Sequence, residues 1–168
     1  MQPWLLLSIP LFLLLLKLVR GEAIFVPLSK KTIRKMLELA EIKKDDILYD
    51  LGCGTGRVII TAAKEYGIKA VGIEKNKILC LICRWNIKRN RVEDRVELIE
   101  NDFFKENLSN ATIVTLYLSQ RLNDEIKPKL EKELRKGTRI ISADHVLSEW
   151  KEVKKIRTEH FYVYLYKI

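Results

Sequence analysis

The chain has 168 residues, of which 48% are hydrophobic and 32% are charged. This length suits one domain, and this balance of residue types excludes a disordered chain and argues against two independently cored domains. The formal net charge of +9, of which +5 lies before residue 45, suits nucleic acid, anionic lipid or an acidic protein as a partner.

The first predicted element is an apolar segment. Residues 3–16 carry no charge, and Leu18 and Val19 extend the run past Lys17. As a helix, residues 3–19 would span about 26 Å, close to the ~30 Å hydrocarbon core of a bilayer. Basic residues follow the run, so the positive-inside rule predicts a single-pass membrane anchor over residues 1–20, with the following domain in the cytoplasm. A cleaved signal peptide and an interfacial helix are the alternatives.

The next element is an amphipathic helix that begins after Ser29, a residue type that favours helix N-caps. Its apolar residues recur with the i, i+3, i+4, i+7 spacing of one helix face. They are Ile33, Met36, Leu37 and Ala40.

Short apolar runs alternate with longer helical patterns through the rest of the chain. The predicted strands lie at residues 45–52, 69–74, 96–102, 112–118 and 138–144. Helices are predicted near residues 57–66, 76–90 and 121–135. This alternation predicts an α/β domain over residues 24–168, built on a mostly parallel sheet with helices on both faces.

The last two predicted strands, residues 153–159 and 161–168, follow each other too closely for a crossover helix. They therefore predict an antiparallel hairpin at the edge of a seven-stranded sheet.

The three cysteines, Cys53, Cys80 and Cys83, do not form an even set for disulfides, which favours a reducing compartment. Cys80 and Cys83 lie one turn apart in a predicted helix and supply only half of a zinc shell. We therefore expect them to pack in the core, and we predict no metal site.

A glycine-rich loop at the end of the first predicted strand carries the strongest chemical signal. It contains Asp50, Gly52, Gly54 and Gly56, and a helix follows directly. Glycines let the backbone approach a ligand closely, and parallel sheets bind ligands at the carboxyl ends of their strands. A leading carboxylate would repel a pyrophosphate but suits a cofactor that carries positive charge. The loop resembles motif I of class I methyltransferases, whose cofactor is S-adenosylmethionine with its ammonium and sulfonium groups.

Two further acids end the next two predicted strands. Glu74 lies 18 positions beyond Gly56, where an acid typically accepts hydrogen bonds from ribose hydroxyls. In the enzymes that the loop resembles, an acid at the position of Asp102 accepts from the adenine amino group, and an apolar neighbour, here Phe103, packs against the ring. An exposed charge at Glu74 and an ordinary strand-end turn at Asp102 are the structural alternatives.

The chain is further similar to the small archaeal protein-lysine methyltransferases and their membrane-anchored mitochondrial relatives. The resemblance rests on residues 25–27, 49–52, 114–118, 123, 128–130, 137–139 and 142–150. It implies a Rossmann-like class I fold and methyl transfer to lysine side chains of proteins, with a membrane-associated substrate among the candidates.

Tyr117 and Asp144 end the fourth and fifth predicted strands and are the candidate catalytic residues. Tyr117 would line the channel for the target amine, and Asp144 would orient it. An RNA or DNA methyltransferase is one alternative, although the fourth strand carries Thr-Leu-Tyr-Leu and not an Asn/Asp-Pro-Pro-Tyr motif. A small-amine methyltransferase and a non-catalytic, cofactor-binding membrane protein are the others.

Overall fold

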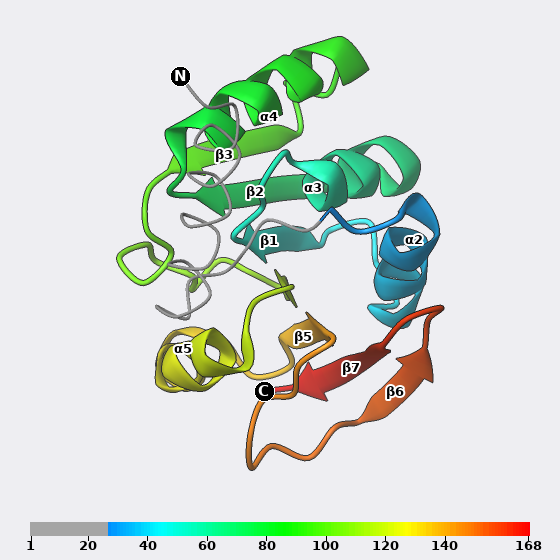
Figure 1. Cartoon of the computed structure of the whole chain (residues 1–168), viewed down its shortest axis with the longest axis vertical. Helices are drawn as coiled ribbons and strands as arrows, with labels where there is room; N and C mark the ends of the chain where they lie inside the picture. The colour runs from blue at the N-terminus through cyan, green and yellow to red at the C-terminus, as the bar shows by residue number, and fades with distance from the viewer. Residues whose placement is uncertain (1–26) are drawn as a thin grey trace, which may run out of the picture.

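The computed structural model describes residues 27–168, which build one seven-stranded sheet (Figure 1). The spatial order of the strands is β3-β2-β1-β4-β5-β7-β6. The strands are β1 (Ile47–Leu51), β2 (Lys69–Glu74), β3 (Val96–Glu100), β4 (Ile113–Leu116), β5 (Arg139–Ala143), β6 (Lys154–Arg157) and β7 (Tyr162–Lys167). The first five run parallel, and β7 runs antiparallel to both of its neighbours.

Helices cover both faces of the sheet (Figure 1). On one face lie α2 (Lys30–Leu39), α3 (Arg57–Thr61) with the π-helical turn η1 (Ala62–Tyr66), and α4 (Lys77–Asn90); the other face is covered by α5 (Gln120–Glu133). The two cores that result lie on opposite sides of the central strands. As predicted, Ser29 caps α2, because its side chain accepts from the amide of Thr32 at 3.1 Å.

The predicted α/β fold is confirmed, including the mostly parallel sheet and the antiparallel edge hairpin. One helix differs from the prediction, because residues 57–66 form a short α-helix that passes into the π-helical turn. Apolar periodicity does not distinguish these two windings over five residues. The N-terminal apolar helix and the anchor over residues 1–20 lie outside the described residues.

The predicted single-pass membrane localisation, with the catalytic domain in the cytoplasm, is corrected. Within residues 27–168, no helix is both long and apolar enough to cross a bilayer. The longest helices of this part, α4 and α5, have 14 residues each, whereas a span needs about 20. The prediction rested on the hydropathy of residues 1–20 alone.

The order of the strands fixes where a ligand can bind. From β1 the chain moves outward to β2 and β3, and then returns to β4 on the other side of β1. The connections after β1 and β4 therefore diverge to opposite sides, which opens a crevice at the carboxyl ends of these strands. Asp50 and the glycine loop lie at this point.

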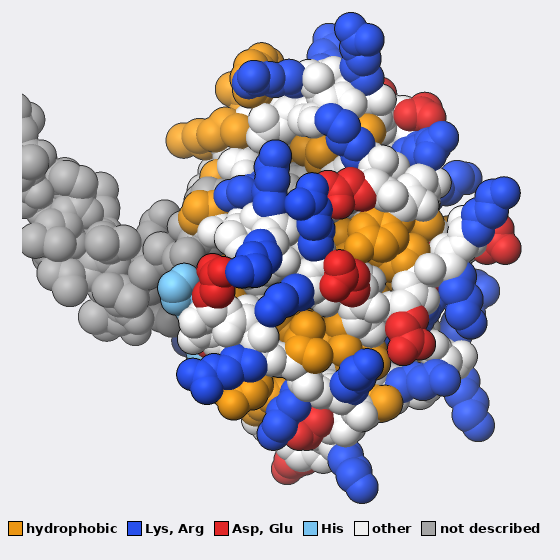
Figure 2. Space-filling view, turned by 90° about the vertical axis from the view of Figure 1, so that its right-hand side faces the viewer, with side chains coloured by type: hydrophobic (Ala, Val, Ile, Leu, Met, Phe, Trp, Pro, Cys, Tyr) orange, Lys and Arg blue, Asp and Glu red, His pale blue; other side chains and the backbone are white. Residues whose placement is uncertain are grey.

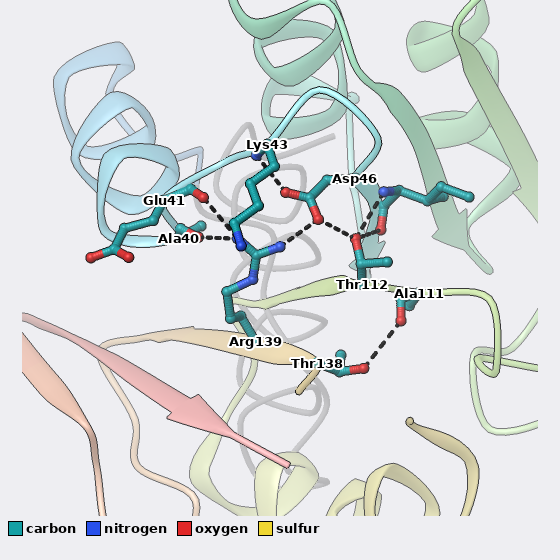
Figure 3. Close-up of polar contacts among 9 residues, drawn as sticks. Ala40, Glu41, Lys43, Asp46, Ala111, Thr112, Thr138 and Arg139 are labelled. Atoms are coloured by element: carbon teal, nitrogen blue, oxygen red, sulfur yellow. Dashed lines mark hydrogen bonds and ion pairs between the residues drawn. The ribbon is translucent and has the colours of Figure 1, made fainter. Parts of the chain in front are cut away.

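A polar cluster ties together the opposite, amino-terminal ends of β1, β4 and β5 (Figure 3). The guanidinium of Arg139 donates to the carbonyls of Ala40 and Glu41 at 2.7 and 2.8 Å, so it satisfies the carboxyl end of α2. It also pairs with the buried carboxylate of Asp46, which accepts from Thr112. This end of the sheet is therefore occupied by structural contacts, and the opposite end carries the acids.

Candidate functional site

The glycine loop between β1 and α3 forms the base of the site. Gly52, Gly54 and Gly56 have φ values of +75°, +55° and +83°, a region that residues with a Cβ rarely adopt. The amides of Gly52 and Cys53 donate to the carbonyl of Ile73 on β2, at 2.9 and 3.1 Å. The loop is thereby held against the carboxyl end of β2 and brings its backbone to the edge of the sheet.

Asp50 lies in the last part of β1, with 6% of its surface exposed. Its Oδ1 accepts a hydrogen bond from the hydroxyl of Thr115 on the neighbouring strand β4, at 2.7 Å. Burial raises the pKa of Asp50 to about 7, the bond from Thr115 opposes this rise, and repulsion by Glu74 adds to it. A cation beside Asp50 would stabilise its charged form.

Glu74 ends β2 and is also buried. Its Oε2 accepts from the amide of Gly54 at 3.0 Å, and its Oε1 accepts from the amide of Asn76 at 2.8 Å. The exposed-charge alternative is therefore wrong, because the carboxylate braces the glycine loop from beneath. Each carboxylate oxygen can still accept a second bond, so Glu74 remains a candidate ligand for two hydroxyl groups.

Asp102 follows β3 in a turn. Its Oδ1 accepts from the amide of Phe104 at 3.0 Å, and its carbonyl accepts from Lys105 at 2.9 Å. Phe103 is buried and contacts Phe104, with ring centroids 4.7 Å apart. The turn alternative is thus realised in the structure, and the predicted adenine contacts of Asp102 and Phe103 stay predictions.

A second group of side chains lies beyond β4 and β5. Tyr117 follows β4, and its ring stacks on Phe161 with centroids 5.6 Å apart. Asp144 follows β5 with a φ of +71°, and its amide donates to the carbonyl of Tyr162 at 2.9 Å. Burial first, and the charge of Asp144 second, raise the pKa of Tyr117. The structure thus brings Asp144 close enough to act on Tyr117.

Sequence reasoning missed Phe161. It precedes β7 in a segment whose alternation indicated only an edge strand. The signal that could have found it is topological, because an antiparallel β7 must begin at the carboxyl end of β5, beside Asp144.

Asn123 on α5 holds the loop that carries Asp144. This fully buried side chain donates through Nδ2 to the hydroxyl of Ser142 at 3.0 Å and to the carbonyl of His145 at 3.2 Å. The Ser142 hydroxyl itself donates to the same carbonyl at 2.6 Å. These contacts fix the two residues that flank Asp144 and Ala143 in the chain, and they keep Asp144 in its left-handed conformation.

The cysteines pack as predicted. Cys80 and Cys83 are fully buried on the inner side of α4, and Cys80 Sγ donates to the carbonyl of Glu74 at 3.2 Å. Over residues 27–168, no three His, Cys, Asp or Glu side chains are grouped so that they could hold a metal ion.

The arrangement fits S-adenosylmethionine. Asp50 and Glu74 are two buried acids that repel each other, with the glycine loop between their strand ends. Such a pair favours a ligand that brings positive charge, which the ammonium and sulfonium groups supply. Gly56 also has no room for a side chain, because a Cβ would lie 2.5 Å from Cys83 Sγ.

Replacing Glu74 with glutamine is expected to weaken binding of S-adenosylmethionine by roughly 10- to 100-fold. The amide has one oxygen where the carboxylate has two, and hydrogen bonds to charged groups contribute about 1.5–3 kcal/mol. Calorimetry on the purified chain measures this change. An affinity that stays within about twofold of wild type would show that Glu74 only braces the loop.

Comparison with known proteins supports this assignment. Residues 50–154 match the family model of the ANTKMT methyltransferase domain. A protein-lysine N-methyltransferase of Saccharolobus islandicus is 44% identical over 149 residues, which cover 86% of this chain and 92% of the relative. A human ATP synthase lysine N-methyltransferase is 29% identical over 126 residues, which cover 75% of this chain and 53% of the relative. The chain thus spans about half the length of that human relative.

A solved structure agrees with these relatives in fold. The crystal structure of an RNA methyltransferase from Salinibacter ruber, in complex with S-adenosylhomocysteine, superposes with a TM-score of 0.84 and 39% identity. The match covers 85% of this chain and 94% of that one. From the family model, the Saccharolobus relative and the cofactor-product complex of this neighbour, we conclude that the chain is a member of the ANTKMT methyltransferase domain family and uses S-adenosylmethionine.

Proposed function

We propose that the chain transfers methyl groups from S-adenosylmethionine to lysine side chains of proteins. The observation that carries this proposal is the pairing of two sites at one edge of the sheet. Asp50 and Glu74 lie at the ends of β1 and β2, and Tyr117, Phe161 and Asp144 lie beyond β4 and β5. One site suits a cationic cofactor, and the other suits an amine on an aliphatic arm.

At the cofactor end, each acid has a separate task. Asp50 pairs with the ammonium group, because its buried carboxylate gains most from a cation. Glu74 accepts from the ribose hydroxyls while it keeps its bonds to the loop. Asp102 and Phe103 bind the adenine. S-adenosylmethionine supplies the methyl group, which its positive sulfur makes electrophilic.

At the target end, the residues hold and orient the amine. A free lysine has a pKa of about 10.4 and enters as an ammonium, so the site must favour loss of a proton before the nitrogen can attack. The Asp144 side chain is 42% exposed and accepts from the ammonium while the proton passes to solvent. The Tyr117 and Phe161 rings pack against the methylene arm and attract the cation.

Tyr117 is not the base in this scheme. Its pKa is raised, so its hydroxyl stays protonated near neutral pH and acts as a hydrogen-bond donor or acceptor. Catalysis then depends mainly on alignment of the amine with the methyl group, for which no covalent nucleophile is needed.

Replacing Phe161 with alanine is expected to raise the KM for a lysine-containing peptide by about 5- to 30-fold. This range corresponds to about 1–2 kcal/mol for a partly buried ring that contacts a cation. The affinity for S-adenosylmethionine should stay unchanged, because Phe161 lies beyond β4 and not at the glycine loop. Steady-state kinetics with calorimetry separates the two effects.

The matched control is Tyr162→Ala, which removes the next aromatic ring along the chain; that ring is 41% exposed and contacts Tyr164 instead of Tyr117. An equal rise in KM for the two variants would contradict a specific role for Phe161.

RNA methylation is the second candidate, and one observation favours it. The solved structure that superposes with a TM-score of 0.84 is that of an RNA methyltransferase, and this chain carries a net charge of +9. Against it, the segment from Thr115 to Leu118 lacks the Asn/Asp-Pro-Pro-Tyr pattern that grips a base amine. The protein-lysine relatives include one at 44% identity, so lysine is the better supported acceptor.

The experiment that separates these candidates uses methyl-labelled S-adenosylmethionine. The purified chain is incubated with whole-cell protein, RNA and small-molecule fractions, and each product is treated with protease or ribonuclease. We expect label in the protein fraction that protease releases and ribonuclease does not. Label that only ribonuclease releases would establish the RNA candidate instead.

A further inference from the structure

Helix α4 is apolar on two opposite faces. Its inner face packs Cys80, Cys83 and Ile87 against β2 and β3. The opposite face carries large apolar side chains with the i, i+3, i+4, i+7 spacing of a single stripe. This α4 stripe consists of Ile78, Leu81, Ile82 and Trp85, which are 71%, 67%, 39% and 57% exposed.

The stripe is a concentration of exposed apolar surface and not a scatter of single residues. Of the seven large hydrophobic side chains that are exposed in residues 27–168, four belong to it. Figure 2 shows hydrophobic side chains beside Lys and Arg at the upper end of the molecule, where α4 lies in Figure 1. Contiguous exposed apolar patches with a polar rim mark interaction sites, whereas single exposed residues do not.

The rim of the stripe is strongly basic. Residues 75–91 contain six basic residues and no acidic residue. Helical spacing places Lys77, Arg84 and Lys88 along one flank, and the guanidinium of Arg89 lies 4.9 Å from the centre of the Trp85 ring. This combination of Trp and Arg beside aliphatic side chains is typical of the residues that carry most binding energy in interfaces.

The charges decide between the possible occupants. A second copy of the chain would bring an equally basic rim against this one, and like charges at short range oppose association. A flat anionic lipid surface would meet the carboxylate of Glu100, which lies on the same flank and pairs with Arg84 at 2.7 Å. A helix with spaced acidic side chains matches the basic positions and leaves Glu100 outside the contact.

We propose that the α4 stripe docks an amphipathic helix of a partner protein, with apolar residues facing the stripe and acidic residues on its flanks. The partner's apolar side chains would pack between Ile78, Leu81 and Trp85 by ridges-into-grooves packing of two helices. Its carboxylates would pair with Lys77 and Lys88. This proposal is independent of the methyl acceptor, because the stripe lies over β2 and β3 on the far side of the cofactor end from Tyr117.

The test uses the full chain and two synthetic helical peptides as probes. Both carry leucines with the i, i+3, i+4, i+7 spacing; one has glutamates on its flanks and the other has lysines. The variant Leu81→Ser with Trp85→Ser removes the centre of the stripe. The control Val153→Ser with Tyr162→Ser removes two side chains of similar exposure, 63% and 41%, at the other end of the sheet.

We expect calorimetry to show at least tenfold tighter binding of the glutamate peptide than of the lysine peptide. This preference should weaken as salt is raised, because it depends on exposed charges. The stripe variant should lose at least tenfold in affinity for the glutamate peptide, and the control should stay within twofold. All variants should keep the thermal midpoint and cofactor affinity of the wild type, since the replaced side chains are exposed.

Three results would overturn the proposal. The first is equal binding of the two peptides, or no binding of either. The second is self-association in sedimentation that the stripe variant abolishes, which would assign the surface to a second copy. The third is binding to vesicles of anionic phospholipid without binding of the glutamate peptide.

Discussion

Replacing Asp50 with asparagine is expected to weaken S-adenosylmethionine binding by roughly 30- to 150-fold. The change keeps the shape of the side chain and its capacity to accept from Thr115, but it removes the charge that faces the cofactor's ammonium. Loss of one charge-assisted hydrogen bond at a buried site costs about 2–3 kcal/mol. Calorimetry on wild type and variant, at a pH above the wild-type transition, measures the difference.

The same substitution should remove a pH dependence. Because the pKa of Asp50 is about 7 without cofactor, the carboxyl is largely neutral below pH 7 and must lose its proton to pair with a cation. Wild-type affinity should therefore rise about tenfold per pH unit up to about pH 7 and level off above it. The asparagine variant should show no such slope. A wild-type affinity that is constant from pH 5.5 to 8 would contradict the role given to Asp50.

The stability of the cofactor-free chain should change in the opposite direction. The folded pKa of about 7 exceeds the ordinary value of 3.8, so the folded chain holds a proton that the unfolded chain has released between these values. This contribution to stability is fully present below about pH 4 and is lost as pH rises toward and through 7.

Replacing Gly56 with alanine is expected to lower the free energy of unfolding by about 2–5 kcal/mol. Two effects add at this position. The backbone has a φ of +83°, which costs a residue with a Cβ about 1–2 kcal/mol, and the new Cβ would lie 2.5 Å from Cys83 Sγ in the core. Overpacking of this kind costs about 1–3 kcal/mol. Denaturant unfolding followed by circular dichroism gives the value.

The chain offers a matched control for this substitution. Gly137 has a similar φ of +93°, but nothing lies within 4 Å of a Cβ built there, so Gly137→Ala should show the backbone cost alone. Adding Cys83→Ala to Gly56→Ala removes the sulfur that clashes and should restore part of the loss. If Gly56→Ala and Gly137→Ala destabilise equally, close packing of the loop on Cys83 is not what selects glycine at position 56.

Local sequence patterns predicted the elements, because each strand and helix here has the periodicity of its own burial. The acids at the ends of β1 and β2 could be placed for the same reason, since a parallel sheet brings its carboxyl ends to one edge. Phe161 could not, because its contact with Tyr117 joins residues 44 positions apart through the pairing of β7 with β5. The links from Arg139 to α2 and Asp46 depend in the same way on tertiary packing.

Two predictions went beyond what a local pattern can support. Hydropathy over residues 1–20 predicted a membrane localisation, and the described part of the chain contains no spanning helix. The spacing of the apolar residues in α4 indicates one buried face, whereas the structure exposes a second one. Periodicity states which residues share a face of a helix, but not whether another element covers that face.

The lysine assignment is tested most directly by the chemical identity of the methylated product. Proteins labelled by the chain and methyl-labelled S-adenosylmethionine are hydrolysed completely to amino acids, which are separated and identified by mass spectrometry, with Asp50→Asn in parallel. We predict that the label elutes as N6-methylated lysine and falls strongly with the variant. Label in methylated arginine, histidine or a nucleoside, with none in lysine, would contradict the proposed function and leave the cofactor site intact.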